Sequence, residues 1–202
     1  ARLPNLIAAL SKKKKSLVPT QCELVGKSVK EIKNLGISLA FVPEDRLGMG
    51  LVGDMDMVNN MMLRSYENGA TPFLRYQEPS ALAEDIKKKL AVNTPSVETP
   101  VRKLSGGNVQ KVLVGREIAS SPRVLMTAYA VRGLDINTSY TIYNILNEQK
   151  KAGLCVIYVG EDLDVLLELA DRILVLSDGQ VTGILDARKT RDRKSTRLNS
   201  SH

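Results

Sequence analysis

The chain has few of the side chains on which several common kinds of functional site depend. It contains no Trp, two Phe and six Tyr among its 202 residues, so it lacks the interleaved aromatic side chains that stack on nucleic-acid bases. Its one histidine is the last residue, and its two cysteines, Cys22 and Cys155, have no metal-type spacing. We therefore expect no zinc site and no disulfide framework. Cys155 lies in an apolar run, which predicts a buried, reduced thiol.

Long apolar runs are also missing. No stretch approaches the roughly 18 apolar residues that a membrane-spanning helix needs. The composition, 43% hydrophobic and 25% charged, is typical of one soluble domain or of part of a larger one. A formal charge of +7 would suit nucleic acid or an acidic membrane surface as a partner.

That charge depends partly on an unusual C-terminal segment. Residues 192–202 resemble the translation of a common short-read sequencing adapter, and we expect this tail to be non-native and exclude it from fold reasoning. The tail carries three of the 29 basic and one of the 22 acidic side chains, so the remaining chain has a formal charge of +5. The tail also contains the only histidine.

Apolar and amphipathic segments alternate along much of the chain. Predicted strands, some bounded by Gly or Pro, cover 21–25, 37–42, 124–128, 154–159, 172–176 and 181–185. Predicted helices cover 5–10, 29–35, 109–119, 138–151 and 163–170. The 37–42 run is expected to be buried on both faces. Strands that alternate with helices of this length predict an α/β fold with a parallel sheet.

Residues 51–103 differ in composition and predict a helical insertion in the α/β domain. Five of the six methionines cluster at or just before its start, and Met57, Met61 and Met62 have helical spacing, which is typical of core filler and sometimes of an adaptable docking surface. Ser80 is expected to cap a further helix whose apolar face carries Leu82, Ile86 and Leu90.

The most informative stretch is Leu104-Ser105-Gly106-Gly107-Asn108. A small hydroxyl and two glycines precede a helix-compatible run, so free backbone N–H groups and the positive end of a helix dipole would face an anion. The glycines would let a phosphate approach the backbone closely. The alternative is an ordinary helix N-cap.

These residues, together with 109–111, resemble the signature motif of ABC transporter ATP-binding domains. Arg132-Gly133-Leu134-Asp135 resembles their D-loop, and Val42-Pro43-Glu44-Asp45-Arg46 resembles their Q-loop region. With the Asn in the signature and the run 94–100, the set is similar to the second nucleotide-binding domain of proteins that energise import of nucleosides and simple sugars. The resemblance implies an incomplete P-loop NTPase-like domain over 1–191, with its helical subdomain at about 51–103.

The resemblance implies that two such domains close head to tail and share ATP and Mg²⁺. Six residues would belong to the nucleotide-contact face: Glu44, Ser105, Gly106, Gly107, Asn108 and Asp135. The implied partners are the first nucleotide-binding domain of the same full-length protein, membrane permease subunits and, indirectly, an extracellular substrate-binding protein, but no nucleic acid. The implied location is peripheral, at the cytoplasmic face of the cell membrane.

Several catalytic positions depart from the family pattern. Residues 2–4 fall where the Walker A loop should end and do not carry its Gly-Lys-Ser/Thr pattern. The Walker B acid and water-orienting Glu are replaced by Ala128 and Tyr129, which cannot hold Mg²⁺ or act as a base at neutral pH. Glu161 stands where the switch histidine is expected; alternatively, it and Asp162 are helix N-terminal acids. We therefore expect a working signature face, no catalytic or metal-ligating residue, and no ATPase activity of this segment alone.

Other interpretations remain open at this stage. Asp135 could be an ordinary N-cap, and Asp45 with Arg46 a local surface ion pair. The chain could belong to a non-transport ABC-type ATPase acting on nucleic acid or ribosomes, or to a structural domain that never contacts ATP.

Overall fold

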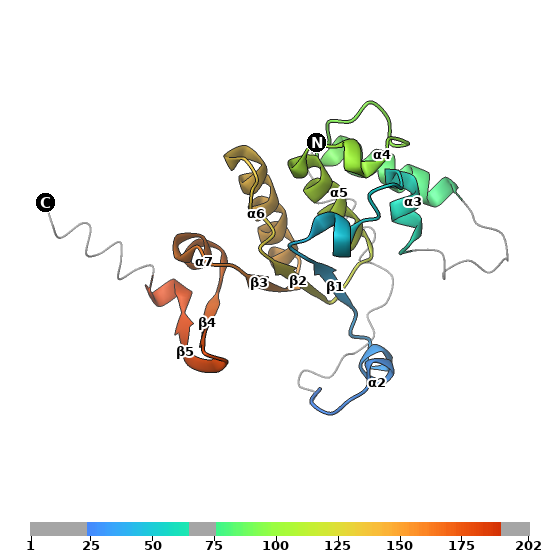
Figure 1. Ribbon diagram of the computed structural model, residues 1–202. Coiled ribbons are helices and arrows are strands. Elements are labelled where there is room, and N and C mark those ends of the chain that lie inside the picture. Colours follow the sequence, from blue (N-terminus) through green and yellow to red (C-terminus); the bar gives the residue numbers. More distant parts are fainter. Residues whose placement is uncertain (1–23, 65–75, 191–202) are drawn as a thin grey trace, which may run out of the picture. The chain divides into compact units, whose positions relative to one another are not determined.

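The computed structural model describes residues 24–64 and 76–190 of the chain (Figure 1). The chain forms two compact units, residues 1–157 and residues 158–202. The predicted helix at 5–10, most of the predicted strand at 21–25 and the tail at 192–202 lie outside the described residues. The two described residues of that strand, Leu24 and Val25, lie in a loop and turn that continues through Gly26.

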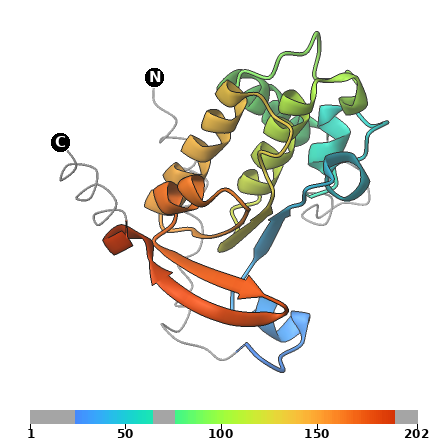
Figure 2. The ribbon, with the colours of Figure 1, turned by 60° about the vertical axis from the view of Figure 1, so that its left-hand side comes forward.

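The first unit is built on a three-stranded sheet with the order β1-β2-β3. These strands are β1 (Leu39–Val42), β2 (Val124–Ala128) and β3 (Cys155–Val159), the last of which extends past the boundary between the units. Strand β1 is parallel to β2, with Leu39 opposite Val124 and Val42 opposite Thr127. The α/β class and the parallel pairing expected from the alternating pattern are thus confirmed (Figure 2).

Helices of the first unit follow the predicted order. They are α2 (Val29–Asn34), α3 (Met57–Met62), α4 (Gln77–Lys89), α5 (Gly106–Ala119) and α6 (Ile136–Lys151), with a π-helical turn η1 (Arg46–Gly50) and a 3-10 turn η3 (Val101–Lys103). Leu113 of α5 and Ile142 of α6 are fully buried, as is Leu125 of β2. Helix α5 contacts β1, η1, α3, α4 and α6, so it is the element around which the first unit is assembled.

Helix α3 confirms that the methionines fill the core. Met57 and Met61 are fully buried and Met62 nearly so. Asn60, also fully buried, donates through Nδ2 to the carbonyl of Val52 at 3.1 Å and accepts the Val52 amide at 2.9 Å. Its amide thus closes the loop that enters α3 without leaving a polar group unsatisfied.

The expected cap of α4 is wrong. The helix begins at Gln77, after Tyr76, and Ser80 lies inside it. Pro79 occupies the first turn, where the missing N–H has no helical acceptor to lose, so the helix starts earlier than the serine signal indicated. Ile86 is buried as expected, whereas Leu82 and Leu90 are half-buried.

Two burial expectations for the sheet are also wrong. Cys155 is an exposed free cysteine, because β3 ends the described sheet and its residues alternate between exposed and half-buried. Leu39, at the start of β1, is 61% exposed; only Ala40 and Val42 of this strand are fully covered. An unbroken apolar run therefore did not mean burial on both faces.

The second unit contains α7 (Leu163–Leu169), β4 (Arg172–Ser177) and β5 (Gln180–Asp186). Strands β4 and β5 pair antiparallel, joined through Asp178 and Gly179, both at positive φ. The hairpin departs from the all-parallel expectation because a two-residue connection can only join antiparallel neighbours. Its small core consists of Leu167, Ile173 and Ala187.

Candidate functional site

The predicted anion site forms the first turn of α5. Ser105 is the N-cap, with extended backbone (φ −63°, ψ 155°). Its Oγ accepts a hydrogen bond from Asn108 Nδ2 at 2.8 Å and a longer one, 3.5 Å, from the Asn108 amide. Asn108 Oδ1 in turn accepts the Asn93 amide at 2.9 Å. The asparagine therefore fixes the serine hydroxyl and ties the helix start to the segment that precedes it.

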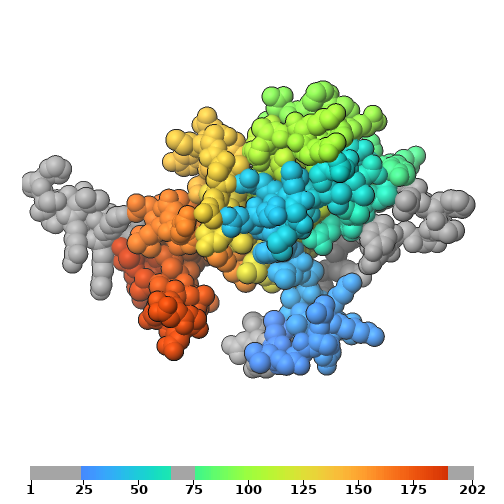
Figure 3. Space-filling view, in the orientation of Figure 1, coloured from blue at the N-terminus to red at the C-terminus, as the bar shows by residue number. Residues whose placement is uncertain are grey.

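Gly106 and Gly107 lie inside the first turn, and not before it as the sequence suggested. Within the described part of the chain, no hydrogen bond engages their two amide N–H groups. Ser105 and Gly106 are exposed and Gly107 is half-buried. The turn thus presents unpaired donors at the positive end of a 14-residue helix, a chemistry that suits a phosphate oxygen. Figure 3 shows the yellow-green segment leading into α5 at the surface, beside the cyan segment that contains η1.

The start of α6 lies directly against this turn. A Cβ at Gly107 would lie 3.0 Å from Thr138 Oγ1 and 3.1 Å from Thr138 Cγ2, which is tighter than ordinary van der Waals contact, so the close approach favours glycine here. Asp135 is the N-cap of α6 and accepts the Thr138 amide at 2.9 Å and the Thr138 hydroxyl at 2.6 Å. These hydrogen bonds lower the pKa of Asp135, the side-chain bond most. The N-cap interpretation is confirmed.

The Q-loop-like and D-loop-like segments meet at Arg46. Arg46 Nε donates to Gln110 Oε1 of α5 at 2.7 Å, and Nη2 donates to the backbone carbonyl of Arg132. The Arg132 guanidinium forms an ion pair with Glu44 at 2.7 Å. The structure thus brings all six expected site residues onto the two helix starts and the loops joined by these arginines.

The alternative of a local ion pair between Asp45 and Arg46 does not hold. The Asp45 carboxylate instead accepts the Gly48 amide at 2.8 Å and caps η1, which leaves Arg46 free to reach α5. Burial lowers the pKa of Arg46, and the nearby Glu44 carboxylate opposes that shift.

The end of β2 holds Ala128 and Tyr129 where the resemblance implies a magnesium ligand and a base. Tyr129 has a positive φ of 50°, a strained conformation for a bulky side chain. The Arg132 guanidinium lies over its ring, 5.7 Å from the centroid. Among the described residues no group of three or more His, Cys, Asp or Glu side chains could hold a metal ion. The donor set here therefore does not fit Mg²⁺.

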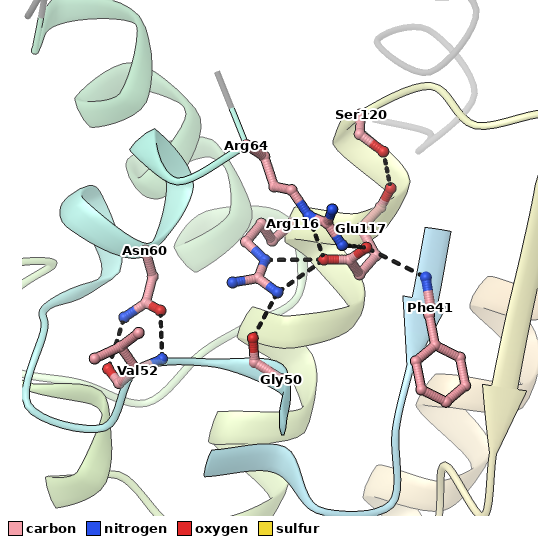
Figure 4. A network of polar contacts seen from close by, with 8 residues as sticks. All are labelled: Phe41, Gly50, Val52, Asn60, Arg64, Arg116, Glu117 and Ser120. Carbon is pink, nitrogen blue, oxygen red and sulfur yellow. Dashed lines mark hydrogen bonds and ion pairs between the residues drawn. The ribbon is translucent and has the colours of Figure 1, made fainter. Parts of the chain in front are cut away.

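Sequence reasoning missed a buried charge cluster at the opposite end of α5 (Figure 4). Glu117 is fully buried and accepts hydrogen bonds from Arg64 at 2.6 Å, Arg116 at 3.0 Å and the Phe41 amide at 3.4 Å. Arg116 also donates to the Gly50 carbonyl at 2.7 Å. Adjacent Arg and Glu on a helix give no sequence signal of burial, because such pairs are usually exposed.

In the second unit, Glu161 precedes α7 and is exposed. The acid that caps this helix is its neighbour Asp162, which accepts the amides of Asp164 at 3.0 Å and Val165 at 3.2 Å. The structural role expected for the pair of acids thus falls to Asp162.

Known proteins resemble the chain in sequence. The xylose import ATP-binding protein XylG of Moorella thermoacetica is 38% identical over 175 residues, which are 85% of this chain and 34% of the relative. The ribose import ATP-binding protein RbsA of Clostridium tetani is 36% identical over 77% of this chain and 31% of the relative. The chain thus spans about a third of the length of these relatives. No protein-family model matches it.

Solved structures resemble it in fold. The dimeric post-hydrolysis ATP-binding cassette MJ0796, bound to ADP and phosphate, matches with a TM-score of 0.67 at 22% identity, covering 81% of this chain and 69% of that one. The protein cbiO1 of Clostridium perfringens, part of the ABC transporter complex cbiONQ, matches with a TM-score of 0.64 at 20% identity, covering 84% of this chain and 65% of that one. Within the described residues, no helix is long and apolar enough to cross a membrane.

Proposed function

We propose that this chain, whose homologues are the ATP-binding proteins of sugar importers and whose fold is that of the ABC cassette, supplies a signature face to ATP held by another domain. In this proposal its own nucleotide site is degenerate. The carrying observation is the first turn of α5, where two unpaired amides and a fixed serine hydroxyl lie at an exposed helix start. Such a turn can stabilise a phosphate without any acid, base or metal of its own.

The start of α5 offers donors that fit a phosphate, whereas the end of β2 offers no ligands that fit Mg²⁺. Ser105, Gly106 and Gly107 offer donors, and Asn108 holds the serine in place. Asp135 and Glu44 belong to the adjoining loops and would lie at the seam between the two domains. Bound ATP with Mg²⁺ would supply the phosphoryl group and its counter-charge. Because Ala128 and Tyr129 offer no carboxylate, the metal ligands would come from the partner domain.

We infer that the partner is a first nucleotide-binding domain in the same full-length protein. That ATP-binding protein would lie peripherally at the cytoplasmic face of the membrane. Permease subunits and, indirectly, an extracellular binding protein would complete an importer for simple sugars or nucleosides. The chain's coverage of only about a third of its curated relatives is compatible with a second domain. Residues 51–103, with α3, α4 and η3, would form the helical subdomain. The tail at 192–202 would be foreign to the protein.

Ser105→Arg tests this proposal in the full-length protein that carries the chain. A long cation at the N-cap blocks the first turn, so ATPase activity and coupled uptake should fall at least about 100-fold, the scale of losing an oxyanion-type donor set. Ser120→Arg, the same change at the exposed C-cap of the same helix, should leave both within about twofold. Unchanged ATPase activity and uptake in Ser105→Arg would refute the signature role.

A second experiment separates the importer from a nucleic-acid-dependent ATPase. The importer should co-purify with membrane permease subunits. The alternative would show RNA binding that weakens steeply with salt and no permease subunits.

A further inference from the structure

We infer that Arg46 is a positioning residue that holds the D-loop turn, residues 130–135, in register with the first two turns of α5. This inference rests on the proposed function, because its consequence is measured as ATP turnover at the signature face. The Arg46 guanidinium donates hydrogen bonds to two segments that are distant in sequence: α5, 64 residues away, and the D-loop turn, 86 residues away.

The three nitrogens of Arg46 face three different places. Nε donates to Gln110 Oε1 at 2.7 Å, Nη2 donates to the Arg132 carbonyl, and Nη1 lies 3.7 Å from the position that a Cβ would take at Gly106. One planar group therefore contacts the second turn of α5, the D-loop turn and the start of the signature face. A guanidinium can do this because its donors are fixed in a fork.

Gln110 depends on this contact. Its side chain is fully buried, and its Nε2 has no hydrogen-bond partner among the described residues. The bond from Arg46 is thus what satisfies the buried amide at its oxygen, and losing it would leave a wholly unpaired amide inside the unit.

A second link between the same segments is weaker. Arg132 and Glu44 pair at 2.7 Å, but their side chains are 59% and 46% exposed, and exposed pairs of this kind contribute little. Arg46 is itself held in η1, where the Leu51 amide donates to its carbonyl at 2.7 Å. The D-loop turn is therefore positioned mainly from Arg46.

The consequence is mechanical. The D-loop turn ends at Asp135, and Thr138, whose amide donates to the Asp135 carboxylate, lies against Gly107. Arg46 on one side and the contact between Gly107 and Thr138 on the other hold this turn to the signature helix at two points. The signature helix and the D-loop turn would then keep a fixed relative position when a phosphate binds at the helix start.

Steady-state kinetics of the full-length protein test this inference. Arg46→Met and Gln110→Ala should each lower kcat by about 10- to 100-fold, the loss expected from small misplacement, while KM for ATP stays within about twofold. The double variant should lose no more than the larger single loss, because both changes remove the same bond. Arg46→Lys should not rescue kcat, since one ammonium cannot span both acceptors.

Arg102→Met is the matched control: it removes an arginine of the same unit whose 2.8 Å pair with Asp54 is exposed, and kcat should stay within about twofold. Wild-type turnover in Arg46→Met, or multiplied losses in the double variant, would overturn the positioning role.

If Ser105→Arg retains activity, the proposed function itself fails. Should Arg46→Met not fold, Gln110→Glu, which keeps an acceptor for Arg46, must retain kcat while Gln110→Ala loses it; equal loss in both would overturn the inference.

Discussion

Gly107 of α5 and Thr138 of α6 approach so closely that a Cβ on the glycine would lie 3.0 Å from the threonine hydroxyl. That hydroxyl is not free to yield, because it donates to Asp135 Oδ2 at 2.6 Å. Packing between two helix starts therefore favours glycine at the second position of the signature-like motif, in addition to any part in phosphate contact. Gly106 has no such neighbour.

Gly107→Ala should destabilise the chain because the added methyl forces α6 away. Overpacking costs about 1–3 kcal/mol, and only about 0.5–1 kcal/mol is regained from helix propensity. Urea unfolding measures the change. Gly106→Ala, whose Cβ would meet only Arg46 Nη1 at 3.7 Å, is the control and should be neutral or slightly stabilising. In a Thr138→Ala background the penalty of Gly107→Ala should vanish; a penalty of the same size there would contradict the packing account.

Asp135 predicts a pH-dependent contribution to stability. Its pKa is lowered in the folded chain by the bonds to Thr138, so its contribution is fully present above the unfolded pKa of about 3.9 and is lost as pH falls through the folded pKa. Asp135→Asn should therefore be less stable than wild type at pH 6, and the two should converge as the pH falls below 4. Denaturant unfolding at several pH values checks this. If the difference in unfolding free energy between wild type and Asp135→Asn grew on acidification, the predicted direction of the pH dependence would be wrong.

Glu117 predicts a large loss of stability on truncation. Glu117→Ala leaves the Arg116 guanidinium, itself only 5% exposed, without its carboxylate, and breaking a buried pair costs about 3–5 kcal/mol. Burial already lowers the pKa of Arg116 and the Glu117 carboxylate opposes this shift. Glu148→Ala, which removes an exposed pair with Lys151, should cost under about 1 kcal/mol. Equal free energies of unfolding for the two variants would contradict a buried, stabilising role for Glu117.

Cys155 predicts rapid thiol labelling. In a Cys22→Ser background, a maleimide should react with the native chain at a rate close to that of the denatured chain, because the side chain is exposed. If labelling required denaturant, the Cys155 side chain would be buried, as the apolar run in the sequence predicted, and this account would be wrong.

The sequence predicted the elements better than their surroundings. Ser105, Asp135 and the apolar runs carry local signals of caps and strands, and the helices and strands from α5 onward lie within a few residues of the expected ranges. Burial of Cys155 and Leu39 could not be read from the sequence, because an edge strand and a central strand have the same apolar composition. Ser80 misled because the first turn of α4 tolerates Pro79, so the helix begins at Gln77, ahead of the serine.

The sequence named candidate site residues but not the contacts between them. Motif order identified Glu44, Ser105 and Asp135, but local spacing gave no indication that Arg46 reaches Gln110 across 64 residues or that Glu117 is buried. Such contacts depend on which side chains the fold brings together. The role of the six site residues at an interface between two domains stays a prediction.

The central claim, that this signature face meets a phosphate held by another domain, is tested most directly by photo-crosslinking in the full-length protein. An ATP analogue with a photoreactive group on the γ-phosphate should label the peptide containing Ser105 to Asn108, and mutation of the partner domain's Walker A lysine should abolish that labelling. Labelling at Ala128 and Tyr129 that survives the lysine mutation, or none at Ser105 to Asn108, would contradict the account.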